Sequence, residues 1–442
     1  MVKRSRRCPL KAKSWVRFPL EVPEERTPAV ITIAGIFIRQ IVCWAIGERM
    51  RRAREKTPFS HRFLTVFKKK GNAESRSSVK KTVRGRNAMT TYFVTGCAGF
   101  IGTTFVHYML KRYPDIRIVN LDALTYAGNL ENLKDLEEDD RHIFVHGNIC
   151  DSALVERIMA EYDPDYIINF AAESHVDRSI ANPEIFVTTN VWGTVNLLQR
   201  AKESWYDAGQ KTWRAGKKYI QISTDEVYGA LGSEGFFTET TPMNPHSPYS
   251  SSKASADHFV KAYSDTYGMP VNITRCSNNY GMYQFPEKLI PLMINNARNH
   301  KPLPVYGDGM QIRDWLFVED HCKAIDMVAK GGKIGEVYNI GGHNERTNLF
   351  IVKTIIRYLS ECLQDPEINE SLIKHVEDRQ GHDRRYGIDP SKIKADLGWY
   401  PETTFEVGII KTIDWYLDHS EWLSRVTSGE YQAYYEEMYK NR

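Results

Sequence analysis

Short runs of apolar residues alternate with helix-length segments over most of this 442-residue chain. Six of the runs are rich in Ile, Val and aromatic side chains and are typical of buried strands: 92–95, 117–121, 143–145, 166–171, 219–224 and 271–276. The segments between them predict helices at 101–113, 152–161, 183–205 and 250–267. Strands and helices in alternation indicate a parallel sheet with helices on both faces. We therefore expect an α/β fold with a Rossmann-type, doubly wound parallel sheet.

The alternation loosens after about residue 280, where turn-rich pieces such as 306–310 and 331–335 appear. Further helices are expected near 287–299, 349–362 and 406–419. This change predicts a smaller C-terminal α/β lobe that binds a substrate. We place the large domain at 89–280 and the mainly substrate-binding lobe at 281–442.

Residues 1–88 differ from the rest of the chain in charge. They carry 23 basic and 6 acidic residues, whereas residues 89–442 carry 36 basic and 49 acidic ones. An apolar stretch at 29–46 is interrupted by Arg39 and Gln40, which disfavours a membrane span. Three interpretations stay open: a start site misassigned upstream of Met89, a basic tether to membrane or nucleic acid, or a poorly ordered tail.

The seven cysteines are scattered and never spaced as CxxC. This pattern argues against a disulfide scaffold or a structural zinc site and fits a reducing cytoplasm. We expect no metal, and a core domain that binds neither nucleic acid nor membrane.

A glycine-rich turn follows the first predicted strand. Gly96, Gly99 and Gly102 permit a tight turn, a close approach to a pyrophosphate and close packing of the next helix on the sheet. Asp122 ends the second predicted strand 20 residues beyond Gly102, where a carboxylate can accept hydrogen bonds from an adenosine ribose. An unphosphorylated ribose suits this carboxylate, so NAD is favoured over NADP. The glycines alone would also fit an ordinary turn between a strand and a helix.

Two residues at the end of the third predicted strand, Asn148 and Ile149, could flank the adenine. Asp is the commoner choice at the position of Asn148. With the glycine turn, they make 89–280 the expected NAD-binding domain.

Tyr249 and Lys253 are four residues apart on a predicted helix, so they lie one above the other on the same face. A nearby ammonium group favours tyrosinate, which predicts a lowered pKa for Tyr249. Lys253 could also bind the nicotinamide ribose. Thr224, at the end of the fifth predicted strand, would hold a substrate hydroxyl while Tyr249 removes its proton and NAD accepts the hydride. Taken alone, this Tyr–Lys spacing is also typical of a solvated helix surface.

Two adjacent carboxylates, Asp225 and Glu226, follow Thr224. Simple hydride transfer needs no such pair, and burying two carboxylates is costly. One protonated acid and one ionised base are what an elimination of water requires. The alternative is that the pair caps the following turn.

From Met89 onward, about four-fifths of the chain resembles the extended short-chain dehydrogenase/reductase family, in its NAD-dependent epimerase/dehydratase group. Within that group the chain is similar to the dTDP-glucose 4,6-dehydratases, since related epimerases and decarboxylases usually lack the Asp-Glu pair. The matching stretches are 95–102, 122–129, 170–179, 224–229, 249–253, 275–281, 286–291, 313–315 and 378–385.

The resemblance implies a lyase that feeds the synthesis of rhamnose-type deoxysugars. Tyr249 and NAD would oxidise C4 of dTDP-glucose, Glu226 would take the C5 proton, and Asp225 would protonate the departing C6 hydroxyl. The hydride would then return to C6. Closely related alternatives are a UDP-sugar 4,6-dehydratase or a 4-epimerase, and an alternative of another class is a non-catalytic NAD-binding scaffold.

The resemblance also assigns the remaining site residues. The cofactor would contact Phe100, Ile101, Asp122, Ala123, Leu124, Thr125, Phe170, Ala171, Ala172, Ser174, Thr189 and Asn279. The nucleotide-sugar would contact Ser174, Thr224, Asn278, Lys288, Leu289, Pro304, Val305, Tyr306, Arg313, Asn348, Asp378, Arg379, Gln380, Gly381 and His382. Lys288, Arg313 and Arg379 suit a diphosphate.

Two residues depart from the family pattern: Met282 and Gln380 each stand where proline is usual. They put the rigidity of two substrate loops in doubt more than the chemistry. The family also implies a homodimer formed through the helices at 183–205 and 250–267.

Overall fold

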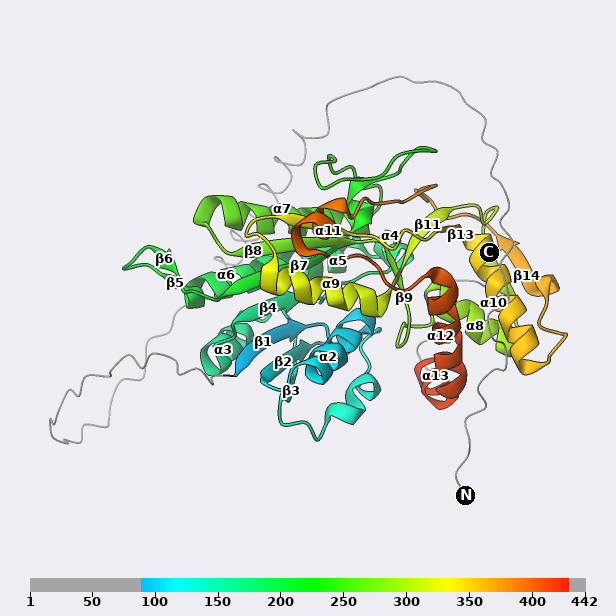
Figure 1. Ribbon diagram of the computed structural model, residues 1–442, viewed down its shortest axis with the longest axis horizontal. Coiled ribbons are helices and arrows are strands. Elements are labelled where there is room, and N and C mark those ends of the chain that lie inside the picture. The colour runs from blue at the N-terminus through cyan, green and yellow to red at the C-terminus, as the bar shows by residue number, and fades with distance from the viewer. Residues whose placement is uncertain (1–88, 429–442) are drawn as a thin grey trace, which may run out of the picture. The chain divides into compact units, whose positions relative to one another are not determined.

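A seven-stranded parallel sheet forms the centre of the computed structural model, which describes residues 89–428 (Figure 1). Its strands, from one edge to the other, are β3 (His142–His146), β2 (Ile116–Asp122), β1 (Thr90–Thr95), β4 (Tyr166–Asn169), β7 (Lys218–Thr224), β8 (Val271–Cys276) and β12 (Val337–Ile340). After β1 the chain adds β2 and β3 on one side of it. The chain then crosses over and adds β4, β7, β8 and β12 on the other side. This order confirms the doubly wound parallel sheet, and the six predicted strands are all present.

Helices cover both faces of this sheet, and β1 is buried along almost its whole length. Tyr92 and Val94 pack with one group of helices, whereas Phe93 between them packs with the other. The first group contains α2 (Phe100–Arg112) and α9 (Val318–Gly331), and the second contains α3 (Ser152–Tyr162), α6 (Thr194–Trp205) and α7 (Pro248–Tyr267). Both faces of the strands are therefore apolar, which is why they appear in the sequence as continuous apolar runs.

The segment predicted as one helix at 183–205 is helical throughout but changes its winding. It begins as α5 (Pro183–Phe186), continues as a π-helical stretch η2 (Val187–Gly193) and ends as α6. Gly193 lies against Ile149, where any larger side chain would overlap it.

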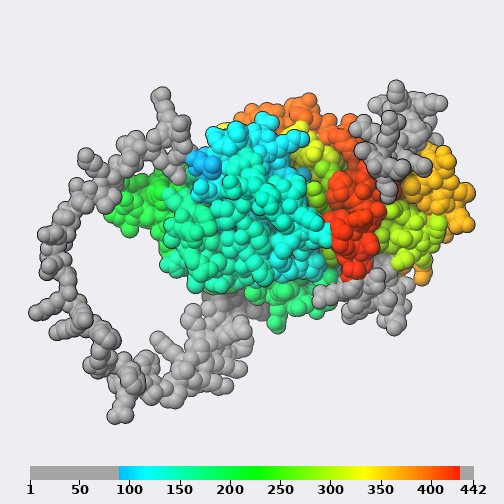
Figure 2. All heavy atoms as spheres, turned by 90° about the horizontal axis from the view of Figure 1, so that it is seen from below, coloured from blue at the N-terminus to red at the C-terminus, as the bar shows by residue number. Residues whose placement is uncertain are grey.

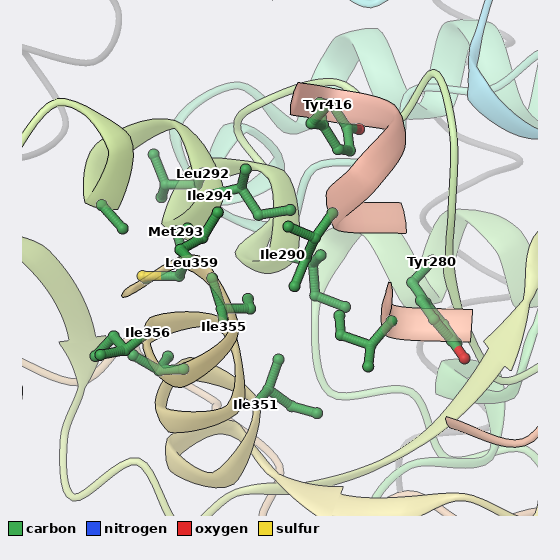
Figure 3. Packing of buried hydrophobic residues seen from close by; sticks show 14 of the residues in the cluster. Tyr280, Ile290, Leu292, Met293, Ile294, Ile351, Ile355, Ile356, Leu359 and Tyr416 are labelled. Atoms are coloured by element: carbon green, nitrogen blue, oxygen red, sulfur yellow. The ribbon is translucent and has the colours of Figure 1, made fainter. Parts of the chain in front are cut away.

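A second group of elements begins at residue 278 and has its own apolar core (Figure 3). Its strands are β9 (Asn278–Tyr280), β10 (Leu303–Tyr306), β11 (Ile312–Phe317), β13 (Glu345–Thr347) and β14 (Ile373–Val376). Its helices are α8 (Leu289–Arg298), α10 (Asn348–Leu363), α12 (Phe405–Asp418) and α13 (Ser420–Val426). Ile290, Ile355 and Tyr416 meet in this core from α8, α10 and α12, the three helices predicted here.

Three elements after residue 280 rejoin the large sheet. Strand β12 pairs with β8, α9 packs beside α2, and α11 (Ser391–Leu397) packs against β12 and α9 through Ile393. The sequence did not predict these elements, because the chain reaches them only after it has started the lobe. The domain division at residue 280 stays a prediction.

The C-terminal helices lie against an early part of the chain. Figure 2 shows α12 and α13, in red, beside the cyan N-terminal third of the described residues. Trp422 donates from Nε1 to Asn132 Oδ1 at 2.8 Å, and Arg425 pairs with Glu131. This contact ties the lobe to the 3-10 turn η1 (Leu130–Leu136) of the large domain.

Residues 1–88, with the apolar stretch 29–46, lie outside the described range. The three interpretations of this segment, a start site misassigned upstream of Met89, a basic tether and a poorly ordered tail, therefore stay open. Within 89–428, no helix is both long and apolar enough to cross a bilayer. The five cysteines in that range are free thiols.

Candidate active site

The glycine turn lies between β1 and α2, at the carboxyl edge of the sheet. Gly96 has a positive φ of 75°, and a Cβ there would come within 2.6 Å of the Ala171 backbone nitrogen. A Cβ on Gly102 would overlap the Gly96 carbonyl oxygen. A Cβ on Gly99, the N-cap of α2, would have only that same oxygen within 4 Å, at 3.4 Å. No side chain caps the helix. The turn therefore leaves backbone N–H groups of a helix N-terminus open to an anion.

Asp122 ends β2 beside this turn. Its two carboxylate oxygens accept from the backbone N–H groups of Ala98 and Leu124, each at 2.8 Å. Burial raises the pKa of this carboxyl, while the two backbone hydrogen bonds act in the opposite direction. Each carboxylate oxygen keeps a lone pair for a further donor. Asp122 is thus held rigidly where it can accept hydrogen bonds from a ribose.

A cleft of about 320 Å³ runs along the carboxyl edge of the sheet from this turn. It brings together most of the predicted cofactor and catalytic residues. They are Gly96, Gly99, Phe100, Ile101, Gly102, Asp122, Ala123, Thr125, Asn148, Ile149, Phe170, Ala171, Ala172, Ser174, Thr189, Thr224, Asp225, Glu226, Tyr249, Lys253, Asn278, Asn279 and Lys288.

Tyr249 and Lys253 lie one turn apart near the start of α7, which a capping box at Ser247 begins. The Lys253 ammonium donates to the Ile222 carbonyl of β7 at 2.6 Å. Burial raises the pKa of Tyr249 well above its usual range, the Glu226 charge adds to this, and a hydrogen bond with Thr224 opposes it. The predicted lowering of this pKa is therefore wrong for the protein alone, because burial and the neighbouring carboxyl groups raise it.

Asp225 and Glu226 open the 3-10 turn η3 (Asp225–Tyr228), which Thr224 caps by accepting from the Glu226 N–H at 3.2 Å. Asp225 is 2% exposed, and its Oδ2 has no hydrogen-bond partner among the described residues. Burial raises the pKa of Asp225 well above its usual range, and Glu226 and Asp314 raise it further. These surroundings therefore favour the neutral form of Asp225.

Glu226 is only partly buried and meets a different charge environment. Burial raises its pKa, but the charges of Arg313, Lys288 and Arg379 act to lower it. The two neighbouring carboxyl groups thus have distinct surroundings. Asp225 accepts from Thr224 Oγ1 at 3.2 Å and has its other oxygen unpartnered among the described residues, whereas Glu226 faces three cations. Such a pair can supply one acid and one base at the same time.

A second cavity of about 190 Å³ opens beyond Glu226, between the sheet edge and the C-terminal lobe. The predicted substrate residues that line it are Ser174, Asn278, Lys288, Leu289, Pro304, Tyr306, Arg313, Asn348, Arg379, Gly381 and His382. Glu226 and Lys288 line both cavities, so the two cavities meet at the carboxylate pair. A ligand in the second cavity can therefore reach groups in the first.

Four predicted site residues line neither cavity. Leu124 packs against the core and donates its N–H to Asp122, while Val305 points into the lobe core, because side chains alternate along β10. Asp378 accepts from His382 Nδ1 at 2.6 Å and so orients that ring instead. Gln380 is exposed.

The sequence did not single out a buried carboxylate, Glu287, that lines both cavities. Arg178 pairs with it at 3.3 Å and stacks over the ring of Tyr126, 3.9 Å from the ring centroid. Burial raises the pKa of Glu287, and Lys288 and Arg178 oppose this. Its place in the matching stretch 286–291, next to Lys288, is the signal that could have drawn attention to it.

Two further residues of the second cavity were also missed, Asp383 and Tyr386. Tyr386 donates to Asp383 Oδ2 at 2.6 Å, and the Arg313 guanidinium stacks over the Tyr386 ring at 4.2 Å. His246 contacts the other oxygen of Asp383 at 2.6 Å, which links the loop before α7 to this lobe. Asp383 belongs to a matching stretch, and Tyr386 follows that stretch directly.

The residues of the first cleft fit a dinucleotide. The uncapped end of α2 can receive a pyrophosphate, and Asp122 a ribose without a 2′-phosphate, because two anions would repel each other. Buried Asn278 Oδ1, which lacks a hydrogen-bond partner within the described range, lies in the wall of the same cleft. The cleft thus fits NAD better than NADP.

The family model described as GDP-mannose 4,6 dehydratase matches residues 93–412. The dTDP-glucose 4,6-dehydratase of Xanthomonas campestris pv. campestris is 55% identical over 346 residues, which are 78% of this chain and 98% of that protein.

Two solved structures of dTDP-glucose 4,6-dehydratases are also similar to this chain. A dTDP-glucose 4,6-dehydratase from Bacillus anthracis in complex with NAD is 49% identical, with a TM-score of 0.68, covering 76% of this chain and 99% of the other. One from Streptomyces venezuelae with NAD bound is 43% identical, with a TM-score of 0.70, covering 76% and 100%.

Proposed function

This chain belongs to the GDP-mannose 4,6 dehydratase family, and we propose that it converts dTDP-glucose to dTDP-4-keto-6-deoxyglucose with NAD in the first cleft. The observation that carries this function is the pair Asp225–Glu226, whose members have different charge environments at the junction of the two cavities. An epimerase needs no such pair, whereas elimination of water needs an acid and a base together.

The chain's own residues would hold the cofactor from both ends. Gly99 and the α2 N-terminus receive the pyrophosphate, Asp122 the adenosine ribose, and Lys253 the nicotinamide ribose. Bound there, NAD would supply the hydride acceptor for oxidation at sugar C4 and the hydride donor for reduction at C6.

Oxidation at C4 would use Thr224 and Tyr249, which hydrogen-bond to each other in the cleft. Thr224 orients the C4 hydroxyl and Tyr249 takes its proton. The C4 ketone that results acidifies the proton on C5, which prepares the sugar for elimination.

Elimination would then use the carboxyl pair. Glu226 removes the C5 proton, and the C6 hydroxyl leaves as water after Asp225 protonates it. Once C6 has been reduced, Glu226 returns its proton to C5. Tyr249 releases to solvent the proton it took from the C4 hydroxyl, and Asp225, which gave its proton to the departing hydroxyl, takes one up from solvent, so the enzyme ends each turnover as it began. Arg313, Lys288 and Arg379 would hold the diphosphate and also favour the ionised form of Glu226.

The test is to incubate the purified, NAD-loaded full chain with dTDP-glucose and to measure the alkaline absorbance of the 4-keto sugar. We expect product with dTDP-glucose and less with UDP-glucose. A folded, NAD-loaded sample that forms no product contradicts the function. Glu226→Gln separates the alternatives, because a 4-epimerase would retain activity and a dehydratase would lose it.

We also propose a homodimer that forms through α5, η2 and α7. These neighbouring elements expose apolar side chains, with Ile185 at 41%, Val187 at 57%, Trp192 at 51% and Phe259 at 39% exposure. Sedimentation should give a dimer for the full chain and a monomer for Val187→Glu/Trp192→Glu. Phe350→Glu, which alters an exposed aromatic residue on α10, should stay dimeric.

A cytoplasmic location is the corresponding proposal for the cell. The five free thiols between residues 89 and 428 support it, because an oxidising compartment favours disulfides. Cell fractionation with an antibody to the chain tests it, and recovery in a membrane or secreted fraction would contradict it.

A further inference from the structure

A buried ion pair lies behind the catalytic residues, on the side away from the cleft. Arg275 of β8 donates from Nε to Asp257 Oδ2 of α7 at 2.9 Å, and the two side chains are 3% and 0% exposed. Removing both charges from water costs several kcal/mol, so a pair of this kind contributes little net stability. Stability therefore does not explain why this buried ion pair is present.

Asp257 belongs to the same face of α7 as the catalytic helix residues. Tyr249, Lys253 and Asp257 follow one another at intervals of four residues. Asp257 supplies the leading opposite charge for buried Lys253. The Arg275–Asp257 pair thus anchors the helix that carries Tyr249 and Lys253 to the sheet.

The other end of Arg275 reaches the turn that carries the carboxyl pair. Its Nη1 donates to the Tyr228 hydroxyl at 2.9 Å, and its guanidinium carbon lies 4.9 Å from the centroid of the Tyr228 ring. The Tyr228 hydroxyl in turn donates to Asn339 Oδ1 of β12 at 2.8 Å. Tyr228 is the last residue of η3, only two positions after Glu226.

We infer that Arg275 and Tyr228 are positioning residues, which hold the Asp225–Glu226 turn in register with the Tyr249–Lys253 helix. This inference rests on the proposed function, in which one set of groups acts on C4 and the other on C5 and C6 of a single sugar. Both sets must be placed at once, and a displacement of about 1 Å can cost about a hundredfold in rate. A residue that contacts both supporting elements is placed to meet that requirement.

The experiment uses Tyr228→Phe in the full, NAD-loaded chain. The ring stays, but the hydroxyl that links Arg275 to η3 is lost. We expect elimination to slow more than oxidation, so that kcat falls about tenfold or more while KM changes less than about twofold. Enzyme-bound NADH should then accumulate in a single turnover, seen by its absorbance, and NAD affinity measured by calorimetry should be unchanged.

Tyr219→Phe is the matched control. Tyr219 of β7 is also fully buried, and its hydroxyl donates to Gln221 at 2.7 Å, away from the carboxyl pair. It should show a similar fall in Tm with normal kcat and no accumulation of NADH. If Tyr228→Phe behaves as Tyr219→Phe does, the positioning role is overturned.

Arg275→Lys answers the same question if Tyr228→Phe does not fold. It keeps a cation beside Asp257 but lacks the planar group that bonds to two partners, so NADH should again accumulate. Normal single-turnover kinetics in a folded Arg275→Lys enzyme would overturn the inference. Absence of 4-keto product from the wild-type chain would instead overturn the proposed function, and the inference with it.

Discussion

At the scale of single residues, the main result is that two adjacent carboxyl groups have different surroundings. Burial and the charges of Glu226 and Asp314 raise the pKa of Asp225, and Arg313 alone among the named cations opposes them. Glu226 instead meets the three cations Arg313, Lys288 and Arg379, which act to lower its pKa. Neutral acid and ionised base can therefore coexist one peptide apart. This arrangement is costly in stability and is kept at sites where chemistry uses it.

Replacing Asp225 by Asn should separate activity from stability. Without its acid, the enzyme should lose about a hundredfold or more in product formation. Because burial raises the folded-state pKa of Asp225 above the unfolded value, the wild-type chain loses stability as pH rises through that interval, and the Asn variant does not.

Urea unfolding at about pH 6 and about pH 8 measures this difference. The variant should gain stability relative to wild type at the higher pH. An equal difference between variant and wild type at both pH values would show that Asp225 is already ionised in the folded protein.

The pH dependence of kcat should report Glu226. The base must be ionised, and burial raises its pKa, so activity should fall on the acid side at a higher pH than an exposed Glu would give. Arg313→Gln removes the leading cation and should shift this fall to still higher pH. Arg384→Gln, which changes an exposed arginine paired with Asp308, should leave the profile in place. A shift to lower pH in Arg313→Gln would contradict the assignment.

At the scale of elements, the glycine turn shows two different uses of one residue type. Gly102 is required by the packing of α2 on the turn, whereas Gly99 has open space on its cleft side. The first requirement belongs to folding and the second to the ligand.

Alanine substitutions should separate these two requirements. Gly102→Ala should lower both Tm and NAD affinity, because its methyl group overlaps the Gly96 carbonyl oxygen. Gly99→Ala should keep Tm within a few degrees but weaken NAD binding about tenfold or more, because its methyl group would occupy the pyrophosphate position. Calorimetric titration and thermal unfolding measure the two effects. Equal losses of Tm would show that the turn, not the ligand, requires both glycines.

The two departures from the family pattern have different consequences in the structure. Met282 packs against the lobe core. The next residue, Tyr283, stacks on His107 at a centroid distance of 5.6 Å and packs at a tilt against Trp415 at 4.8 Å. Ring packing thus restrains this loop where proline is usual. Gln380 is exposed beside the second cavity, and its loop is held by neighbours such as the Asp378–His382 hydrogen bond.

At the scale of the whole molecule, the topology of the sheet creates the site. Strands β1, β4, β7 and β8 run parallel, so their carboxyl ends bring segments from residue 96 to residue 276 to one edge. The C-terminal lobe closes the second cavity over the same edge. The anionic substrate meets a few placed cations there, since residues 89–442 are acidic as a whole.

A chain that begins at Met89 should retain the activity. The family match spans 93–412, and the site is built from residues within that range. We expect kcat and KM within about twofold of the full chain's values, measured by the 4-keto assay. A folded but inactive truncated chain would favour the scaffold function that the basic segment suggests.

Much of this architecture could be predicted because it depends on local patterns in the sequence. Apolar runs predicted β1 and β8, and four-residue spacing placed Tyr249 and Lys253 on one helix face. The return of β12 to the sheet could not be predicted in this way, because its partner strand lies some sixty residues earlier and turn-like residues precede it. The π-helical winding of 187–193 has no sequence period of its own.

The fold class, the glycine turn and the Asp225–Glu226 motif could be predicted from the sequence, because each depends on residues that lie close together along the chain. Which carboxyl group is the acid, and in which direction the pKa of Tyr249 moves, depend on burial and on charges such as Arg313, nearly ninety residues away. The link from Asp257 through Arg275 to Tyr228 is of the same kind. Electrostatic energy depends on distance and solvent access in the folded molecule, and neither quantity can be read from positions along a chain.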